Sequence, residues 1–358
     1  MADAKTPVKI REVEFPDIKD AWQGLEQTGD LPTIFQCYGW IEPWWRHLGR
    51  GKKILLAAYD GDLLVGIAPM FIERMTLKGM PFFNILRFMG TPESDYHAFI
   101  LRQGYEDKTL SALLTALKQY SWDIAWLSDV KPDTATTDLL AKALKAEGLH
   151  FIEKQHTPCP YIKLPNTMDE YLNTLTKHTK TNIRTYVNRL SKAGDVSIKK
   201  VYNKTDVESE FDHFLKLHMA RWSSLGQCGA LAKKGLREFH INAANLLCQY
   251  LDLSFLTING KRIATQYAYN YQNTRLNYLS GIDPAYEDYR VGSIMKFKLI
   301  ENAIEEKIMC FDLMRGDEKY KYHFTKTVQY NRCYCFTTSR LKLFFFVMVE
   351  QLSEKQNK

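Results

Sequence analysis

Two stretches of the chain show the same order of apolar runs and tight turns. Residues 54–73 (ILLAAYDGDLLVGIAPMFIE) and 253–271 (LSFLTINGKRIATQYAYNY) each hold two apolar runs separated by an Asp-Gly or Asn-Gly pair. This is the pattern of a β-hairpin, because such pairs readily adopt the positive φ angles of a tight turn. Each hairpin is followed by a strand, a helix and a further strand candidate, at 82–90, 108–120 and 122–130 and at 274–283, 292–306 and 307–314. The pattern predicts a duplicated α/β fold of two tandem halves, each a mixed sheet flanked by helices.

A long amphipathic helix is predicted between the halves, over residues 167–194. Apolar side chains fall on one side of it, and Lys177, Lys180 and Arg184 gather on another. The basic side is either a solvated face or a face that attracts an anion, such as a phosphate-bearing ligand. Two more helices are predicted before the second hairpin, at 207–226 and 236–251.

The length of 358 residues indicates two domains. We expect an N-terminal domain at 8–156, joined by a C-terminal helix at 340–353, and a C-terminal domain at 157–339. With 45% hydrophobic and 25% charged residues, the composition is that of a globular protein. There is no apolar run of about 18 residues to span a bilayer and no apolar segment of a secretory signal at the N-terminus. We therefore expect a cytoplasmic protein, with weak membrane-surface association of the apolar segment 341–352 as an alternative to its docking on the body.

The net charge and the cysteine spacing indicate which ligands and cross-links to expect. A formal net charge of +7 suits an anionic small ligand and permits weak RNA contact, but it is well short of a dedicated nucleic-acid binder, so neither DNA nor tRNA is expected as a partner. The seven cysteines form no C-x-x-C pair and no zinc-site spacing with histidine. We predict no metal and no disulfide, with Cys333 and Cys335 as small buried thiols on one face of a strand.

Two short segments are candidates for chemistry. The segment 310–321 (CFDLMRGDEKYK) begins as a buried strand and ends as a dense cluster of charges, which is either a solvated turn or a working site. The segment DYRVGSIM places Arg290, Gly292 and Ser293 at the start of a predicted helix. Amides at a helix N-terminus bind anions and glycine permits close approach, although a Gly-Ser pair there is also an ordinary helix cap.

The run from 277 to 324 closely resembles the CelD-type branch of the GNAT acetyltransferase superfamily. In that branch a "G.DP.Y" strand end, a Gly-Ser helix start and an "FDF.RG.E.YK" block occur together, and all three have counterparts here. The resemblance extends over residues 34–336 through FQCYGWIEPWW, DGDLLVGIAPM and GTPESDYHAF. The superfamily motif itself is matched in part, because Arg290 stands only two residues before Gly292 and Ile294 replaces a small residue. The branch is also similar to FemABX-type peptidyltransferases, which use aminoacyl-tRNA and share an aromatic-Lys-x-x-Phe element, here YKYHF.

The resemblance implies an acyl-CoA N-acyltransferase fold and specific roles for named residues. Acetyl-CoA would be the donor, with its pyrophosphate at Arg290, Val291, Gly292 and Ser293. Lys321 would stabilise the oxyanion, Asp312 or Glu318 would accept a proton, and Tyr289 or Tyr320 would protonate the leaving thiolate. For each carboxylate an ion pair with Arg315 or Lys319 is an equal alternative. The residues expected to bind the acceptor are Asp95, Tyr96, Arg315 and Tyr320.

The predicted function is transfer of an acetyl or other acyl group from acyl-CoA to an amine or hydroxyl of a small molecule or a polysaccharide or envelope precursor. Two alternatives stay open: an aminoacyl-tRNA-dependent FemABX-like peptidyltransferase, and a non-catalytic scaffold of a polysaccharide-synthesis complex. The sequence leaves the acceptor and the acyl length open, and it does not decide whether Trp40, Trp44 and Trp45 are core or line a sugar site. The first half lacks a Gly-led helix start after its strand, so we expect one CoA per chain.

Overall fold

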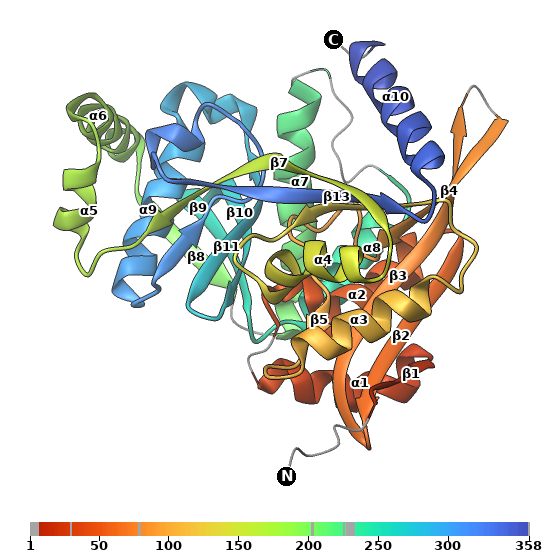
Figure 1. The fold of residues 1–358 in the computed structure, drawn as a ribbon. Helices are drawn as coiled ribbons and strands as arrows, with labels where there is room; N and C mark the ends of the chain where they lie inside the picture. Colours follow the sequence, from red (N-terminus) through yellow and green to blue (C-terminus); the bar gives the residue numbers. More distant parts are fainter. Residues whose placement is uncertain are drawn as a thin grey trace. The chain divides into compact units, whose positions relative to one another are not determined.

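The computed structural model describes residues 7–28, 31–77, 80–201, 204–224, 226 and 233–356. The chain divides into two compact units. Unit 1 comprises residues 1–157 together with 330–358, and unit 2 comprises residues 158–329. Figure 1 labels the helices and strands of both units.

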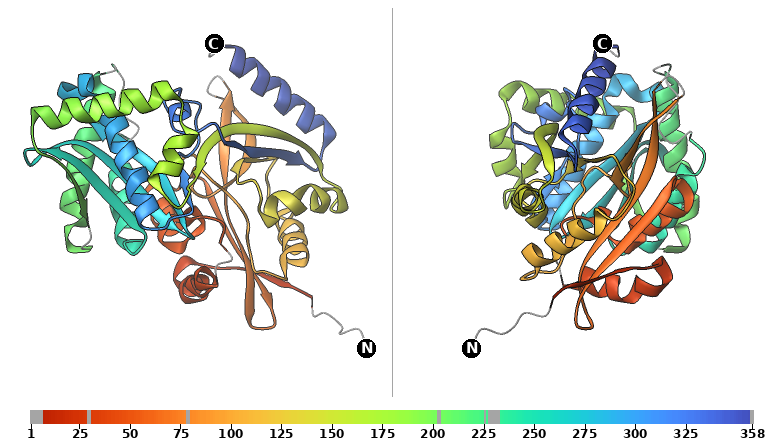
Figure 2. Two further views of the ribbon diagram at one scale, coloured as in Figure 1. Left: turned by 90° about the vertical axis from the view of Figure 1, so that its left-hand side faces the viewer. Right: turned by 45° about the vertical axis from the view of Figure 1, so that its right-hand side comes forward.

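Unit 1 is a sheet covered by helices on both faces. Its strands are β1 (Lys9–Glu12), β2 (Lys52–Asp60), β3 (Leu63–Leu77), β4 (Met80–Phe88), β5 (Ile100–Leu101), β6 (Ile124–Val130) and β13 (Val328–Thr337). Its helices are α1 (Phe15–Gln27), α2 (Tyr38–Leu48), α3 (Glu106–Leu117), α4 (Ala135–Ala146) and α10 (Arg340–Gln356). The sheet order is β1-β2-β3-β4-β6-β13, with β5 on β3, and β4 and β6 are parallel. Figure 2 shows α1 and α2 on one side of the long strands and α3 and α4 on the other.

Unit 2 repeats the same plan. Its strands are β7 (His150–Lys163, by its C-terminal part), β8 (Val196–Val201), β9 (Leu251–Ile258), β10 (Lys261–Tyr271), β11 (Thr274–Ile282) and β12 (Cys310–Asp312). Its helices are α5 (Met168–Thr174), α6 (Lys177–Ala193), α7 (Val207–Ser224), α8 (Leu236–Leu246) and α9 (Val291–Glu305). The order is β7-β12-β11-β10-β9-β8, and β11 and β12 are parallel.

The duplicated α/β fold predicted from the sequence is confirmed. In unit 1 a hairpin, β2–β3, is followed by β4, α3 and the parallel strand β6; in unit 2 the hairpin β9–β10 is followed by β11, α9 and the parallel strand β12. The Asn259-Gly260 turn has φ angles of 48° and 79°, as a type I′ hairpin turn requires.

The last antiparallel strand of each sheet comes from the other half of the sequence. In unit 1 it is β13, which pairs with β6 so that Phe336 lies opposite Ala125. In unit 2 it is the C-terminal part of β7, which pairs with β12 so that Tyr161 lies opposite Asp312. Nothing in the period-2 pattern of a strand identifies its partner, so this exchange was not predicted.

Helices pack on both faces of the unit 2 sheet. On one face, α6 and α9 join the strands in an apolar core that includes Leu190, Leu256, Ile263 and Leu299. On the other face, Tyr267 of β10 contacts aromatic rings of α7 and α8. Strand β10 therefore contributes side chains to the packing on both faces of the sheet.

Two predicted elements differ from the structure. The helix predicted at 167–194 is two helices, α5 and α6, because Thr176 adopts an extended conformation and caps α6 by accepting a hydrogen bond from the Thr179 amide at 3.1 Å. The strand predicted at 307–314 is only Cys310–Asp312. It ends there because Met314 has a positive φ of 64°, which a strand does not accommodate.

Several predicted side chains have clear positions. Trp40 and Trp44 are fully buried in unit 1, so they are core residues, and Cys333 and Cys335 are buried on β13. Helix α10 buries Leu343 and Phe346 against unit 1. None of the described helices is both long and apolar enough to cross a membrane.

Candidate functional site

Unit 2 contains a cavity of about 270 Å³ at the N-terminus of α9. Its walls come from α7, β10, the end of β11, the first turns of α9 and Tyr320. The four residues predicted to bind the cofactor, Arg290 to Ser293, all line it. The structure thus brings the predicted anion site to a cavity large enough for part of a ligand.

The first turn of α9 is open to an anion. Arg290, its N-cap, has a left-handed conformation (φ 59°, ψ 38°) and gives the helix no side-chain hydrogen bond. Among the described residues, no acceptor contacts the amides of Val291 and Gly292. These amides and the positive end of the helix dipole therefore provide binding for negative charge.

Gly292 is not required by the fold. A Cβ built there would have a single neighbour within 4 Å, Ile282 Cγ2 at 3.6 Å, and the residue does not have a positive φ. An ordinary side chain would thus fit the protein without strain. Its absence keeps the wall of the cavity open, which suits close approach of a ligand to the backbone.

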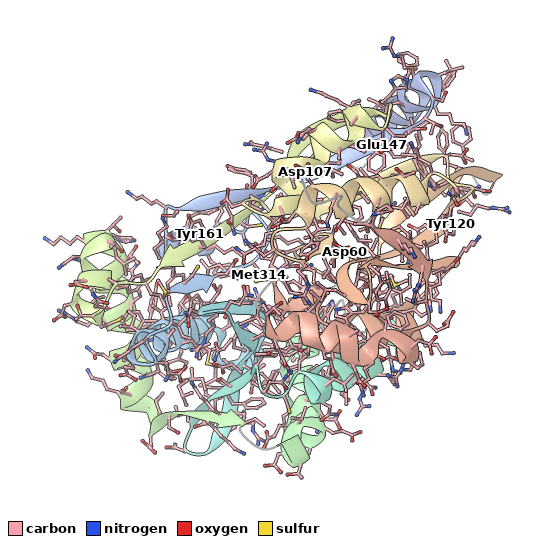
Figure 3. The ribbon with its side chains drawn as sticks, turned by 60° about the horizontal axis from the view of Figure 1, so that its bottom comes forward. Asp60, Asp107, Tyr120, Glu147, Tyr161 and Met314 are labelled. Carbon is pink, nitrogen blue, oxygen red and sulfur yellow. The ribbon has the colours of Figure 1, made fainter. Side chains whose placement is uncertain are left out.

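The topologically equivalent helix of unit 1 has the opposite electrostatic character. Helix α3 carries Glu106 and Asp107 in its first turn, and Figure 3 labels Asp107 on this helix. Two carboxylates at this position would repel a pyrophosphate. The expectation of a single cofactor site, in the second half, remains a prediction that this difference supports.

The charged segment after β12 forms a compact, hydrogen-bonded loop. Asp312 is buried and its Oδ1 accepts a hydrogen bond from the Met314 amide at 2.8 Å. Figure 3 shows Met314 and Tyr161 in this part of unit 2. The backbone reverses through Met314 and Gly316, whose φ angles are 64° and 121°.

Lys321 holds this loop together. Its side chain is 3% exposed, and its Nζ donates to the carbonyls of Met314 at 3.0 Å, Arg315 at 2.8 Å and Gly316 at 3.3 Å. Glu318 Oε2 lies 2.8 Å from the same nitrogen. The acceptors around the ammonium group at least equal its three N–H donors, so in this conformation Lys321 is a structural cation. Its predicted role in oxyanion stabilisation would require the loop to open.

The other predicted site residues are distributed over both units. Tyr320 lines the cavity, and burial followed by the negative charge of Glu318 raises the pKa of its phenol to about 12. Tyr289 does not line the cavity; its ring lies 5.1 Å below the guanidinium of Arg189. Arg315 is half-buried in the loop.

Asp95 and Tyr96 are buried within unit 1. The Asp95 carbonyl accepts a hydrogen bond from Asn331 Nδ2 at 2.9 Å, and the Tyr96 carbonyl accepts one from Gln36 Nε2 at 2.9 Å. Both segments are therefore fixed by side chains from elsewhere in the unit. Their proposed acceptor-binding role has no direct support from these contacts.

Sequence reasoning missed Lys296, which lies in the cavity wall. It is 4% exposed and its Nζ donates to Gln266 Oε1 at 3.1 Å. Burial is the main cause that lowers its pKa well below the usual lysine value, and the positive charges of Lys321 and Arg221 lower it further. A lysine in an amphipathic helix normally reaches solvent, so the sequence carried no signal for this burial.

A neutral histidine, His218, is hydrogen-bonded to Ser280, a residue of the cavity wall. His218 Nε2 accepts a hydrogen bond from Trp222 Nε1 at 3.1 Å, so Nδ1 carries the proton and donates to the Ser280 carbonyl at 2.8 Å. Burial lowers the pKa of His218, and it lowers that of nearby His240 to about 3. Both imidazoles are neutral in the folded protein at pH 7.

This burial predicts that the protein loses stability in mild acid. In the unfolded chain these histidines bind protons below about pH 6.5, whereas in the folded protein their pKa values are lower. Stability is therefore complete above pH 6.5 and is lost as pH falls from 6.5 toward the folded pKa values. For His240 alone we expect a loss of about 2 kcal/mol between pH 7 and pH 5.

Denaturant unfolding at these two pH values measures the loss. In the variant His240→Phe, the loss of stability between pH 7 and pH 5 should be smaller by about 2 kcal/mol. Replacing the exposed His178 by Gln should leave this loss unchanged. An equal loss in the His240→Phe variant and the parent would contradict the assignment.

Comparisons with known proteins agree with this architecture. Residues 177–322 match the family model described as an acetyltransferase (GNAT) domain. FemX aligns with 11% identity and a TM-score of 0.61 over 91% of this chain and 96% of that chain. The C-terminal domain (DUF2156) of a putative lysylphosphatidylglycerol synthetase from Agrobacterium fabrum aligns with 10% identity and a TM-score of 0.58 over 94% and 95%. L-PGS from Bacillus licheniformis aligns with 10% identity and a TM-score of 0.51 over 89% and 97%.

These findings support the fold, and residues 177–322 are similar to an acetyltransferase (GNAT) domain. No curated protein sequence matches the chain. The likeness to the solved structures, at identities near 10%, concerns the fold alone. In the described part of the chain, no group of three or more His, Cys, Asp or Glu residues could hold a metal ion. The CelD-type assignment remains a prediction.

Proposed function

We propose that the protein transfers an acyl group, most simply acetyl, from acyl-CoA to an amine or hydroxyl of a small molecule or an envelope or polysaccharide precursor. The acyl-CoA site is the N-terminus of α9 in unit 2. The observation that carries the proposal is Gly292: the fold has room for a side chain there, yet the position has none and lines the cavity beside helix amides that donate to no protein acceptor among the described residues.

The residues of the cavity fit a CoA thioester. The pyrophosphate would be received by the amides of Val291 and Gly292, with Arg290 supplying positive charge. The thioester supplies an activated acyl carbon, and the protein's part is to hold it and to manage the proton released by the acceptor. Tyr320, whose phenol stays protonated at pH 7, is a donor at the cavity wall.

A binding experiment tests this function without knowledge of the acceptor. Calorimetry with acetyl-CoA or CoA should find one site per chain, because of the two topologically equivalent helices α3 carries two carboxylates in its first turn and α9 carries none. At a concentration about 100 times the dissociation constant, CoA should stabilise the protein by about 2.7 kcal/mol, which a melting curve detects. Absence of binding would refute the proposal, and two equivalent sites would refute its location.

A second candidate function is transfer from aminoacyl-tRNA, and one observation favours it. Helix α6 carries five basic residues and no acidic residue: Lys177, Lys180, Arg184, Arg189 and Lys192. A basic helix of this kind could contact a nucleic-acid backbone. Mobility-shift titrations with tRNA at low and moderate salt discriminate the two functions: tight tRNA binding with no CoA binding would favour aminoacyl transfer.

A further inference from the structure

Lys296 lies one helical turn below the proposed pyrophosphate site. It is four residues after Gly292, so the two share a face of α9 and are about 6 Å apart along the helix axis. Both line the cavity, and only 4% of Lys296 is exposed. The Lys296 side chain is thus part of the same cavity wall that would bind acyl-CoA, one turn further along α9.

The hydrogen bonding of Lys296 suits a neutral amine. Gln266 Nε2 donates to the backbone carbonyls of Leu279 at 2.7 Å and Tyr267 at 3.2 Å, so the orientation of its amide is fixed and Oε1 points to Lys296. Among the described residues, this oxygen is the single hydrogen-bond acceptor for Lys296 Nζ. An ammonium group would leave two of its three donors without protein partners, whereas a neutral amine leaves one donor and a lone pair facing the cavity.

The charges around Lys296 have mixed signs. Arg221 of α7 and Lys321 after β12 oppose a proton on it, whereas Glu318 favours one. Burial is the largest influence and also favours the neutral form. Lys321, by contrast, has four oxygen neighbours, the carbonyls of Met314, Arg315 and Gly316 and a carboxylate oxygen of Glu318. Two lysines of one unit thus have different hydrogen-bonding surroundings: Lys321 is fully engaged by its own loop, whereas Lys296 keeps hydrogen-bonding capacity toward the cavity.

We propose that Lys296 is the proton shuttle of acyl transfer; this rests on the acyl-CoA function proposed above. The acceptor nitrogen attacks the thioester carbonyl, so that a C–N bond forms and the C–S bond breaks. The excess proton on that nitrogen passes to Lys296 Nζ, and Lys296 then delivers it to the thiolate sulfur. The products are the amide and the CoA thiol, and the lysine returns to its neutral state.

Hydroxylamine, a small amine that is uncharged at neutral pH, serves as the acceptor in a turnover test with acetyl-CoA, and thiol release is measured. Lys296→Met should lower kcat by about 10² to 10⁴-fold while CoA affinity, from calorimetry, stays within a few-fold. The parent's rate should fall as pH drops through the lysine's titration, and this limb should be absent in the variant. Lys296→Gln, which can still donate a hydrogen bond to Gln266, should lose activity as Lys296→Met does. Lys298→Met, on the same helix, should have the turnover of the parent.

A second measurement needs no acceptor. Binding of anionic CoA beside a neutral amine should draw a proton onto it, so calorimetry in buffers of different ionisation enthalpy, from pH 6 to 9, should show proton uptake. The uptake should be smaller in Lys296→Met. Equal uptake in both proteins, or parent-like turnover by Lys296→Met and Lys296→Gln, would overturn the shuttle while leaving the acyl-CoA function intact. Failure of the parent to bind CoA would instead refute the function itself.

Discussion

Gly292→Glu is expected to abolish CoA binding while the protein stays folded. The new side chain would place a carboxylate at the first turn of α9, where the pyrophosphate needs positive potential. Bulk and charge act together, so we expect affinity to fall by more than about 100-fold, which corresponds to about 2.7 kcal/mol. Calorimetry with CoA gives the affinity, and a melting curve of the unliganded protein shows that the fold is kept.

Gly292→Ala separates the fold from the ligand site. Its methyl group has ordinary contact distance to Ile282, so the unliganded protein should be as stable as the parent or slightly more so, because alanine is the better helix former. CoA binding should still weaken, since the methyl group stands in the path of the ligand. If the Gly292→Glu protein binds CoA as the parent does, the cofactor site lies elsewhere.

The largest loss of stability is expected from Arg275→Met. Arg275 is fully buried on β11, and its guanidinium lies 3.0 Å from Asp252 and 2.5 Å from Glu306. It also donates to Asn270 Oδ1 at 2.8 Å and to the Leu299 carbonyl at 3.2 Å. The arginine thereby ties the C-terminal part of α9 to β9 and β11.

Removing Arg275 takes away the fully buried counter-charge of Asp252, which is 4% exposed, and leaves it the ammonium of Lys200 at 3.8 Å. Breaking a buried ion pair on one side typically costs about 3–5 kcal/mol, and denaturant unfolding measures it. The matched control is Lys142→Met, which removes an ion pair with Asp107 whose side chains are 72% and 62% exposed; a loss below about 1 kcal/mol is expected there. Similar small losses in both variants would show that the buried cluster is not a stabilising junction.

The hairpins and the α9 segment were predictable because their signals are local. An Asn-Gly pair between apolar runs determines its own turn, and Gly292 and Ser293 before an apolar run mark the start of α9 within a few residues. The boundary between α5 and α6 also has a local signal, because Thr176 and Thr179 have the spacing of a helix cap. The boundary was missed because the helical period of apolar residues continues across it.

The distinction between the two lysines could not be found in this way. Lys321 belongs to a recognisable charged block, yet its hydrogen bonds go to three carbonyls of its own loop. Lys296 looks like any helical lysine, and its burial depends on Gln266 of β10, thirty residues earlier in the chain. Protonation state is set by the surroundings in three dimensions, which residue spacing does not encode.

The exchanged last strands have a consequence for biosynthesis. The sheet of unit 1 is completed by β13, so the edge of β6 has no partner until residues 328–337 have been translated. The C-terminal part of β7, by contrast, is made before the rest of unit 2. On the ribosome, the half that is begun first is thus the last to close, and until then it presents an open strand edge of the kind that promotes aggregation.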